Sequence, residues 1–380
     1  MCYEYDLIIL LSKPWLNKQE ESTLVDIVKK VLDWDLIYDK LQRHRIVPIA
    51  YHHIKTNKLE LYIPRKILNT IKKEFETNKI KQEVYFEEVK PIFKEFKKSN
   101  LKFCVLKGVV LQELLYPKFT RMFKDVDILI YKEDYGEVLK ILKKYDFSNE
   151  QDSSIKRNKR ERVFLLLNTY EFPNFNKEII VNNQSIKLQI DLQHMHTLAT
   201  KMKYSIETLE ELKCSEEIVV NKIKINRQRL DYLLIHLCTH TFGDCTTISE
   251  IVLKKAFRLR NFADIVSLAD MFSSFYLSDD FYELVKKTNT AQPVYFCLYY
   301  CKQIYQVSEL FAKIVEKIGS LLSDYKFLEQ CGFEDGVDRV IVWEAPLMDK
   351  MFSEESINEV KEKAKNSIKK YACYDTRFDI

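Results

Sequence analysis

The sequence has 380 residues, 46% of them hydrophobic and 31% charged, and a formal net charge of +4 at pH 7. A charge this close to balance argues against nucleic-acid binding driven by bulk electrostatics. No uncharged apolar run approaches the ~18 residues that a membrane span needs, and nine cysteines without a CxxC pair are typical of reduced thiols. We therefore expect a soluble, cytoplasmic protein with no membrane partner.

Residues 1–85 are expected to form an N-terminal helical region. Apolar residues recur at helical spacing over residues 21–55 and again over 63–100, with Pro64 near the start of the second stretch. Pro91 lies inside that second stretch, where it should kink or restart the helix.

Residues 86–200 are expected to form a central α+β domain, because strand-like and helical patterns alternate there. A short strand, "LKFCVL", leads into Lys107-Gly108, a short helix, a loop and the alternating run "DVDILIY". A helix is then expected over 132–147. Further strands are expected, with a hairpin turn at Asn182-Asn183, over 162–172, 177–183 and 185–193.

Residues 201–380 are expected to form a C-terminal helical domain, and the aromatic run "VYFCLYYCKQIYQ" within it predicts a core or the wall of a groove. His236 and His240 share a helix face near Cys245 and could bind zinc. No glutamate follows the first histidine as in the metalloprotease signature, so we favour helix packing for these residues.

The strand "DVDILIY" carries two acids at alternate positions. Residues i and i+2 of a strand point to one face, so Asp125 and Asp127 should project side by side while Val126 faces the core. Two carboxylates this close repel each other, and a divalent cation relieves the repulsion. Mg²⁺ accepts one or two carboxylates together with water and substrate phosphates.

A third acid, Asp191, lies in another predicted strand, where alternation places it on one face with Gln189 and Gln193. Three carboxylates on adjacent strands can hold two metal ions roughly 4 Å apart, in the arrangement that stabilises an in-line displacement at phosphorus. The metal ligands predicted from the sequence are therefore Asp125, Asp127 and Asp191.

The turn before the first short helix offers an anion site. A glycine between a strand and a helix lets backbone N–H groups approach a phosphate, and the helix N-terminus favours negative charge. Lys107 adds a cation beside Gly108, and Arg121 is a further candidate for phosphate binding.

The stretch "LKGVVLQELLYPKFTRMFKDVDILIYKEDYGEVLKILKKYDF" resembles a nucleotidyltransferase family of the DNA polymerase β superfamily. That family has leucine-lysine-glycine, a helix ending in tyrosine-proline, an arginine and then Asp-x-Asp. The helical stretches "DWDLIYDKLQRHRIVPIAYHHI", "LLIHLCTH" and "FRLRNFADIVSL" extend the resemblance over roughly residues 30 to 270.

The resemblance implies that Asp125 and Asp127 bind catalytic Mg²⁺, that Lys107 and Gly108 hold the nucleotide phosphates, and that Asp191 is the third carboxylate and the base. The family usually has histidine where this sequence has Gln193, with His194 and His196 nearby, so the role of that histidine is open. Asp264 falls in the matching helical motif and could equally cap a helix or form a structural ion pair.

The sequence thus predicts an Mg²⁺-dependent nucleotidyltransferase that moves a nucleoside monophosphate, by default AMP from ATP, to a small molecule, sugar or peptide. Three alternatives remain. The first is a toxin-like enzyme acting on tRNA, which a basic groove would favour; the basic residues 156–162 could contact an anionic acceptor, although a surface loop is the default interpretation for them. The second is a non-catalytic nucleotide-binding module, and the third is a kinase-type use of the same site.

Overall fold

The computed structural model describes residues 3–149, 172–181, 183–195, 204, 206–332 and 340–371. Contacts divide the chain into two compact units. Unit 1 comprises Met1–Leu41, Ile46–Thr200 and Tyr204–Leu233, and unit 2 comprises Gln42–Arg45, Lys201–Lys203 and Leu234–Ile380. This division differs from the boundaries expected near residues 85 and 200, because the N-terminal helices and the central sheet belong to one unit.

Four short helices open unit 1, namely α1 (Tyr3–Ser12), α2 (Lys18–Val28), α3 (Trp34–Arg43) and α4 (Val47–Thr56). A capping box between Asn17 and Glu20 starts α2, because each side chain binds a backbone N–H that the helix leaves unpaired. The following helix, α5 (Arg65–Lys98), begins after Pro64 and runs for 34 residues with Pro91 inside it. The helix thus continues through the position where the sequence predicted a kink or a restart.

Unit 1 contains a six-stranded mixed sheet in the order β3-β4-β2-β1-β6-β5. β2 and β4 are parallel, as are β1 and β6, and the remaining neighbours are antiparallel. The strands are β1 (Phe103–Val105), β2 (Val126–Ile130), β3 (Phe175–Val181), β4 (Gln184–Gln193), β5 (Glu216–Val220) and β6 (Ile223–Arg227). The predicted α+β class is therefore confirmed.

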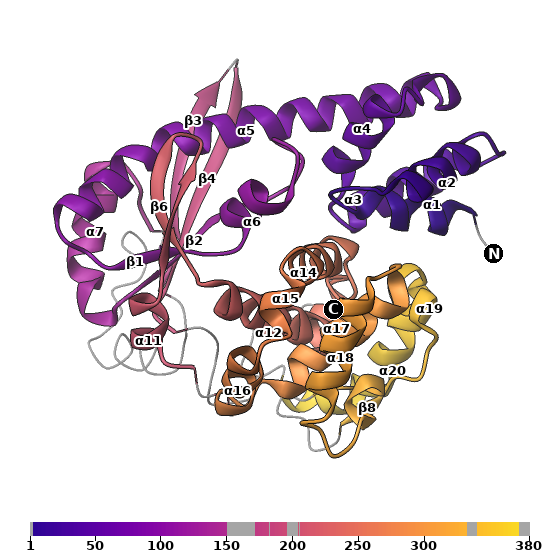
Figure 1. Ribbon diagram of the computed structural model, residues 1–380. Helices are drawn as coiled ribbons and strands as arrows, with labels where there is room; N and C mark the ends of the chain where they lie inside the picture. The colour runs from indigo at the N-terminus through magenta and orange to yellow at the C-terminus, as the bar shows by residue number, and fades with distance from the viewer. Residues whose placement is uncertain are drawn as a thin grey trace. The chain divides into compact units, whose positions relative to one another are not determined.

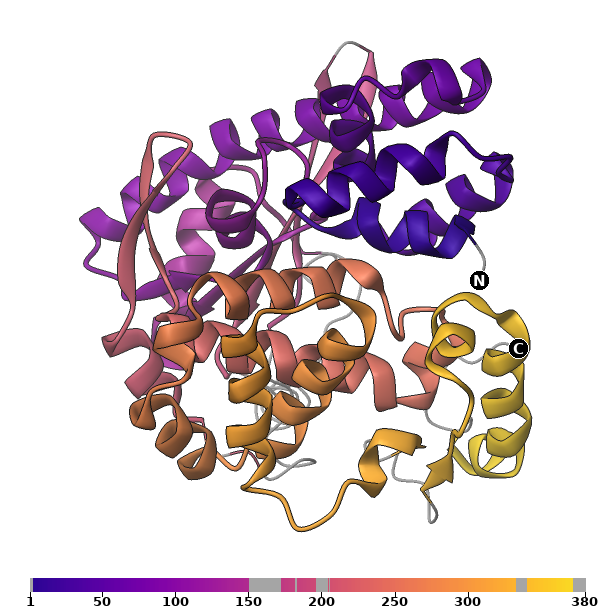
Figure 2. The same cartoon turned by 45° about the vertical axis from the view of Figure 1, so that its right-hand side comes forward.

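The long helix α5 crosses one face of this sheet (Figures 1 and 2). Near its C-terminal end, Phe93 and Phe96 pack on Phe103 of β1, with ring centroids 5.5 and 5.2 Å apart. Because side chains alternate along a strand, Cys104 points to the opposite face, where it packs against Leu212 of α11 (Thr208–Lys213). Phe103 therefore faces α5 and Cys104 faces α11. The pairing of β1 with β2 assigns the two faces of β2 in the same way.

The chain between β1 and β3 supplies α6 (Gly108–Leu115), the short η2 (Lys132–Asp134) and α7 (Tyr135–Lys144). The predicted hairpin joins β3 to β4, with Val181 opposite Gln184 and Asn183 in the left-handed region at φ 59°. The strand predicted over 162–172 lies outside the described residues except for its last one.

The hairpin of β5 and β6 was not expected from the sequence, which predicted helices beyond residue 200. Asn221 and Lys222 join the two strands, and both have positive φ, as in the two-residue turns that match strand twist. Pairing of β6 with β1 adds this hairpin to the sheet, so the predicted boundary at residue 200 falls within unit 1.

Unit 2 is mainly helical. Its longer elements are α12 (Leu230–Thr246, which begins in unit 1), α14 (Leu259–Met271), α16 (Asp279–Lys287), α17 (Ala291–Ile304), α18 (Glu309–Gly319) and α20 (Glu354–Tyr371). Shorter elements are α13 (Ile248–Val252), α15 (Ser273–Tyr276), α19 (Leu347–Phe352), β7 (Gln330–Cys331) and β8 (Ile341–Val342). Among the described helices of the whole chain, none is long and apolar enough to cross a membrane.

Candidate active site

Two of the three predicted acids are direct neighbours on the sheet. β2 and β4 run parallel with Asp127 opposite Asp191, and each residue is 9% exposed. Paired residues on neighbouring strands point to the same face of a sheet, and neighbouring strands lie about 4.8 Å apart. The apolar partners Val126 and Ile190 point to the other face and are buried. The predicted alternation is present in β4 and, from Val126 onward, in β2; the strand does not include Asp125, which was predicted to project from it beside Asp127.

Asp125, the third predicted acid, lies in the bend immediately before β2 and is half-buried. Across the described ranges, no group of three or more His, Cys, Asp or Glu side chains is placed to hold a metal ion. The site therefore contains a pair of carboxylates, Asp127 and Asp191, and Asp125 directly precedes the start of β2. Two carboxylates remain within the number that Mg²⁺ accepts when water and phosphate complete its shell.

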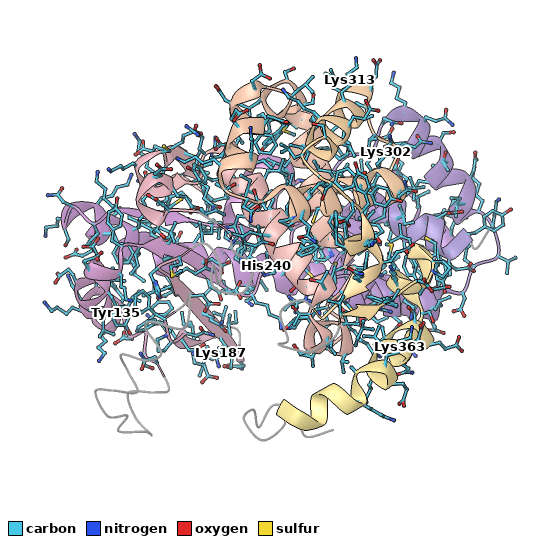
Figure 3. All side chains as sticks on the ribbon, turned by 90° about the horizontal axis from the view of Figure 1, so that it is seen from below. Tyr135, Lys187, His240, Lys302, Lys313 and Lys363 are labelled. Carbon is cyan, nitrogen blue, oxygen red and sulfur yellow. The ribbon has the colours of Figure 1, made fainter. Side chains whose placement is uncertain are left out.

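Amide side chains flank the carboxylate pair. Gln189 Nε2 donates to both oxygens of Asp191, at 2.9 and 3.1 Å, and Gln193 Nε2 donates to Asp127 Oδ1 at 3.1 Å. Gln193 is fully buried, and its Oε1 accepts no hydrogen bond in the described part of the chain. A buried acceptor without a donor is costly, so this oxygen is a candidate ligand for a cation. Lys187, on the same face of β4, is exposed (Figure 3).

The predicted phosphate turn lies beside this pair. Lys107 Nζ is 3.9 Å from Asp127 Oδ1, and the Lys107 backbone has φ 43° and ψ −110°, which places the strained residue of the turn at the lysine rather than at Gly108. A non-glycine residue in such a region costs about 1–3 kcal/mol and is typical of functional sites. The turn presents the N-terminus of α6 and a lysine ammonium at the same place.

Gly108 is needed for close packing. A Cβ on this residue would lie 2.8 Å from Phe123 Cβ and 3.2 Å from an Nη of Arg121. The Arg121 side chain is buried and is thus brought to the phosphate turn, as the sequence predicted for a phosphate-binding arginine. Lys107, Gly108 and Arg121 are therefore close in space, although Arg121 follows the turn by a whole helix and loop.

A row of polar side chains on α5 holds the loop that leads into Asp125. Asn78, Gln82 and Tyr85 donate hydrogen bonds to the backbone oxygens of Phe119, Arg121 and Lys124, respectively. The three donors share one face of the helix because they are three and four residues apart. Sequence reasoning missed these residues; buried polar residues at helical spacing were the available signal.

Tyr85 links the strands that carry the acids. Its hydroxyl donates to Lys124 O and accepts from Gln189 N at 2.7 Å, so it joins the start of β2 to β4. Burial raises the pKa of the Tyr85 phenol above its usual range; the backbone hydrogen bond from Gln189 lowers it, and the carboxylates of Asp125, Asp191 and Asp127 raise it further. All three predicted acids therefore lie within electrostatic reach of one hydroxyl.

The other candidates do not form a second metal site within the described residues. His236 is buried, whereas His240 is exposed and lies 3.6 Å from Asp244 (Figure 3). Burial raises the pKa of the Cys245 thiol, which accepts a hydrogen bond from Phe257 N at 3.3 Å. The burial of His236 and Cys245 agrees with the favoured interpretation as helix-packing residues, whereas the exposed His240 does not pack in this way.

The remaining predicted positions are not part of the carboxylate pair. His194, directly after β4, is buried, and its ring is tilted by 58° against that of Phe172, with ring centroids 4.9 Å apart. Asp264 is buried in α14, within unit 2. His196 and the basic residues 156–162 lie outside the described residues.

Comparison with known proteins adds the family. No curated protein matches the chain. One solved structure, an antigenic nucleotidyltransferase-like protein from Paracoccidioides brasiliensis, is 11% identical with a TM-score of 0.32, and the match covers 55% of this chain and 92% of that one. We draw no argument from a likeness of this size. A family model described as uncharacterised nucleotidyltransferase matches residues 30–306. The chain therefore belongs to this nucleotidyltransferase family.

Proposed function

We propose that this nucleotidyltransferase moves a nucleoside monophosphate from a nucleoside triphosphate to an acceptor in an Mg²⁺-dependent reaction, with ATP as the default donor. The pairing of Asp127 with Asp191 on adjacent parallel strands carries the proposal, because two carboxylates side by side repel each other and a divalent cation relieves the repulsion. The acceptor we propose is a small molecule, a sugar or a peptide. The near-balanced charge of the chain weighs against tRNA.

The residues present fit a magnesium ion. Asp127 and Asp191 supply hard oxygen ligands, and Gln193 Oε1 is a buried acceptor oriented by the bond from its own amide to Asp127. When bound, Mg²⁺ would neutralise the charge of the phosphates and the attacking oxygen. Asp127 and Asp191 would hold a single ion, because the described residues include no group of three such ligands that also brings in Asp125.

The chain's own residues supply positioning and charge. The Lys107 ammonium and the N–H groups that open α6 would bind the phosphates of the donor, with Arg121 behind them. The acceptor oxygen would form a bond to the α-phosphorus while the bond from that phosphorus to the bridging oxygen of the β-phosphate breaks. Pyrophosphate leaves, and the proton of the acceptor hydroxyl passes to Asp191.

Thermal unfolding with and without Mg²⁺ and a non-hydrolysable ATP analogue tests the binding step. At about 100 times the dissociation constant, a ligand stabilises its protein by roughly 2.7 kcal/mol. We expect a clear rise in Tm for the wild type and none for Asp127→Asn. Asp146→Asn is the matched control, because Asp146 has φ 64°, which asparagine tolerates, and its carboxylate is exposed. Equal stabilisation of all three proteins would contradict the proposed site.

A further inference from the structure

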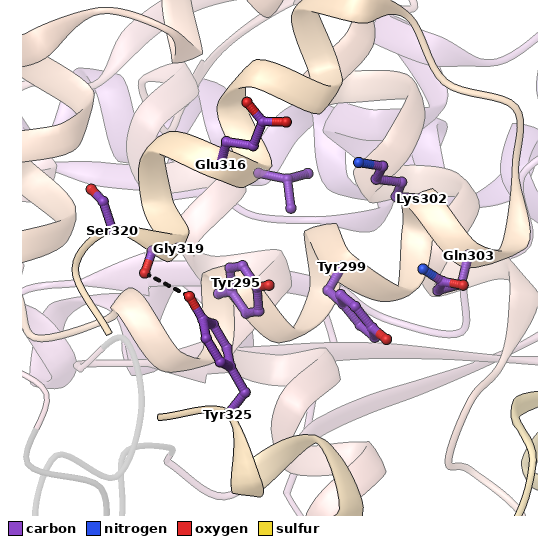
Figure 4. Close-up of a pocket in the computed structure, with 9 residues that line it drawn as sticks. Tyr295, Tyr299, Lys302, Gln303, Glu316, Gly319, Ser320 and Tyr325 are labelled. Atoms are coloured by element: carbon purple, nitrogen blue, oxygen red, sulfur yellow. Dashed lines mark hydrogen bonds between the residues drawn. The ribbon is translucent and has the colours of Figure 1, made fainter. Parts of the chain in front are cut away.

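Unit 2 contains a cavity of about 450 Å³, and none of the residues assigned above to the transfer reaction lines it (Figure 4). It is formed by α17 from Tyr295 onward, the second half of α18 and the segment that follows as far as Tyr325. Its volume lies within the range of small-molecule sites. The cavity belongs to one unit, so its shape does not depend on how the two units are arranged.

Three tyrosines form one wall of the cavity. The Tyr295 ring lies between the other two, with its centroid 6.0 Å from that of Tyr299 and 5.0 Å from that of Tyr325. A Cβ at Gly319 would lie 2.9 Å from Tyr295 Cε2, and the Tyr325 hydroxyl donates to Gly319 O at 3.2 Å. The glycine at the end of α18 thus lets the rings pack closely, and the wall is held in place before any ligand binds.

Polar groups of both signs line the rest of the cavity. Lys302 and Gln303 come from α17, and Glu316 comes from α18. In Figure 4, Lys302 and Glu316 lie on the same side of the row of tyrosines. An ammonium and an amide N–H donate hydrogen bonds, whereas a carboxylate and an amide oxygen accept them. The cavity therefore combines an aromatic wall with donors and acceptors and has no net charge.

The aromatic rings and the opposite charges of the lining side chains favour one class of ligand. An aromatic wall attracts cations, but Lys302 opposes a cation, and Glu316 likewise opposes an anion. The rings are inclined at 25° and 42°, so they do not form the parallel pair that would clamp a flat base on both sides. A sugar ring places C–H groups on one face and hydroxyls around its edge, and each hydroxyl both donates and accepts.

We propose that this tyrosine-walled cavity binds a neutral sugar ring, with the C–H face on the row of tyrosines and the hydroxyls on Lys302, Gln303 and Glu316. Binding would require neither nucleotide nor Mg²⁺, so the inference does not depend on the proposed transfer reaction. It gives unit 2 a ligand site of its own.

Saturation-transfer NMR on the full chain tests this inference. The probes are millimolar methyl glycosides of glucose, galactose, mannose and N-acetylglucosamine, with adenosine and uridine as a separate arm. We expect transfer to the ring C–H protons of at least one glycoside and affinity at least tenfold weaker in Tyr325→Ala. Tyr62→Ala is the matched control, because Tyr62 lies in unit 1 and is 47% exposed, compared with 46% for Tyr325.

A second variant tests whether binding can be lost without a folding defect. Glu316→Lys changes an exposed side chain and makes the lining doubly positive, so it should abolish glycoside binding without altering the circular dichroism spectrum. Three results would overturn the inference: no transfer to any glycoside, equal transfer in the wild type and both variants, or transfer only to the base protons of the nucleosides.

Discussion

Asp127 and Asp191 are register partners on the parallel strands β2 and β4, and the amide of Gln193 fixes one carboxylate while that of Gln189 fixes the other. The sheet thereby holds two negative charges side by side with few degrees of freedom. Such preorganisation matters because phosphoryl-type transfer is catalysed by positioning and charge stabilisation. The predictions below test the groups that surround this pair.

The ammonium of Lys107 should hold the donor's phosphates. Hydrogen bonds to charged groups contribute about 1.5–3 kcal/mol, so Lys107→Met should weaken ATP binding roughly 10- to 150-fold. Titration calorimetry with a non-hydrolysable analogue measures this change. Lys140→Met, at an exposed position of α7, is the control and should bind as the wild type does.

The strained backbone of Lys107 gives a second variant at the same position. Lys107→Gly should raise the free energy of unfolding by about 1 kcal/mol, because glycine adopts φ 43° without strain, and should also lose ATP binding. If Lys107→Gly is more stable than the wild type but no longer binds ATP, the lysine serves ligand binding and not the stability of the fold. Loss of stability in Lys107→Gly would show that the turn conformation is not strained.

The hydroxyl of Tyr85 should position the acids. Tyr85→Phe removes two hydrogen bonds of a buried phenol, to Lys124 O and from Gln189 N, and at about 0.5–1.5 kcal/mol each this should cost about 1–3 kcal/mol of stability. Because the reacting groups lose alignment, kcat should fall while KM for ATP changes little. A variant with wild-type stability and wild-type kcat would show that the hydroxyl has no positioning role.

The same variant gives a pH test. The pKa of Tyr85 is raised in the folded state, so its contribution to stability is fully present below the unfolded pKa of about 10 and is lost as pH rises through the folded value. The stability difference between wild type and Tyr85→Phe, measured by urea unfolding, should therefore be smaller at pH 10.5 than at pH 7. A difference that grows with pH would reverse this sign.

Gly108 and Gly136 provide a matched pair of substitutions. A Cβ at Gly108 meets Phe123 Cβ at 2.8 Å, so Gly108→Ala should cost about 1–3 kcal/mol. A Cβ at Gly136 meets nothing within 4 Å, and Gly136→Ala should gain about 0.5–1 kcal/mol because alanine favours helix α7. Chemical denaturation compares the two, and equal effects would contradict the close packing at Gly108.

Much of the candidate site could be predicted from local sequence patterns. Side chains alternate between the two faces of a strand with a period of two residues, whatever the rest of the fold. This period predicted which face Asp127 shares with its strand neighbours and that Asp191 and Gln193 lie on one face. The strand order that makes Asp127 and Asp191 neighbours is a long-range property. The spacing of residues within either strand does not predict it.

Other features depended on contacts that no local pattern reveals. The hydrogen bonds of Asn78, Gln82 and Tyr85 require α5 to lie along a loop far away in the sequence. The hairpin of β5 and β6 was missed because short strands between helical stretches give a weak signal. The aromatic run of α17 was predicted as core or groove wall, and the structure contains both, since Tyr300 is buried whereas Tyr295 lines the cavity.

Label transfer in cell extract with Mg²⁺ tests the central claim most directly. ATP labelled at the α-phosphate is compared with ATP labelled at the γ-phosphate, using the wild type, Asp127→Asn and the Asp146→Asn control. We predict transfer of the α-label to an acceptor, lost in Asp127→Asn and retained in Asp146→Asn, and no transfer of the γ-label. Transfer of the γ-label alone would identify a kinase-type reaction and contradict nucleotidyl transfer at Asp127 and Asp191.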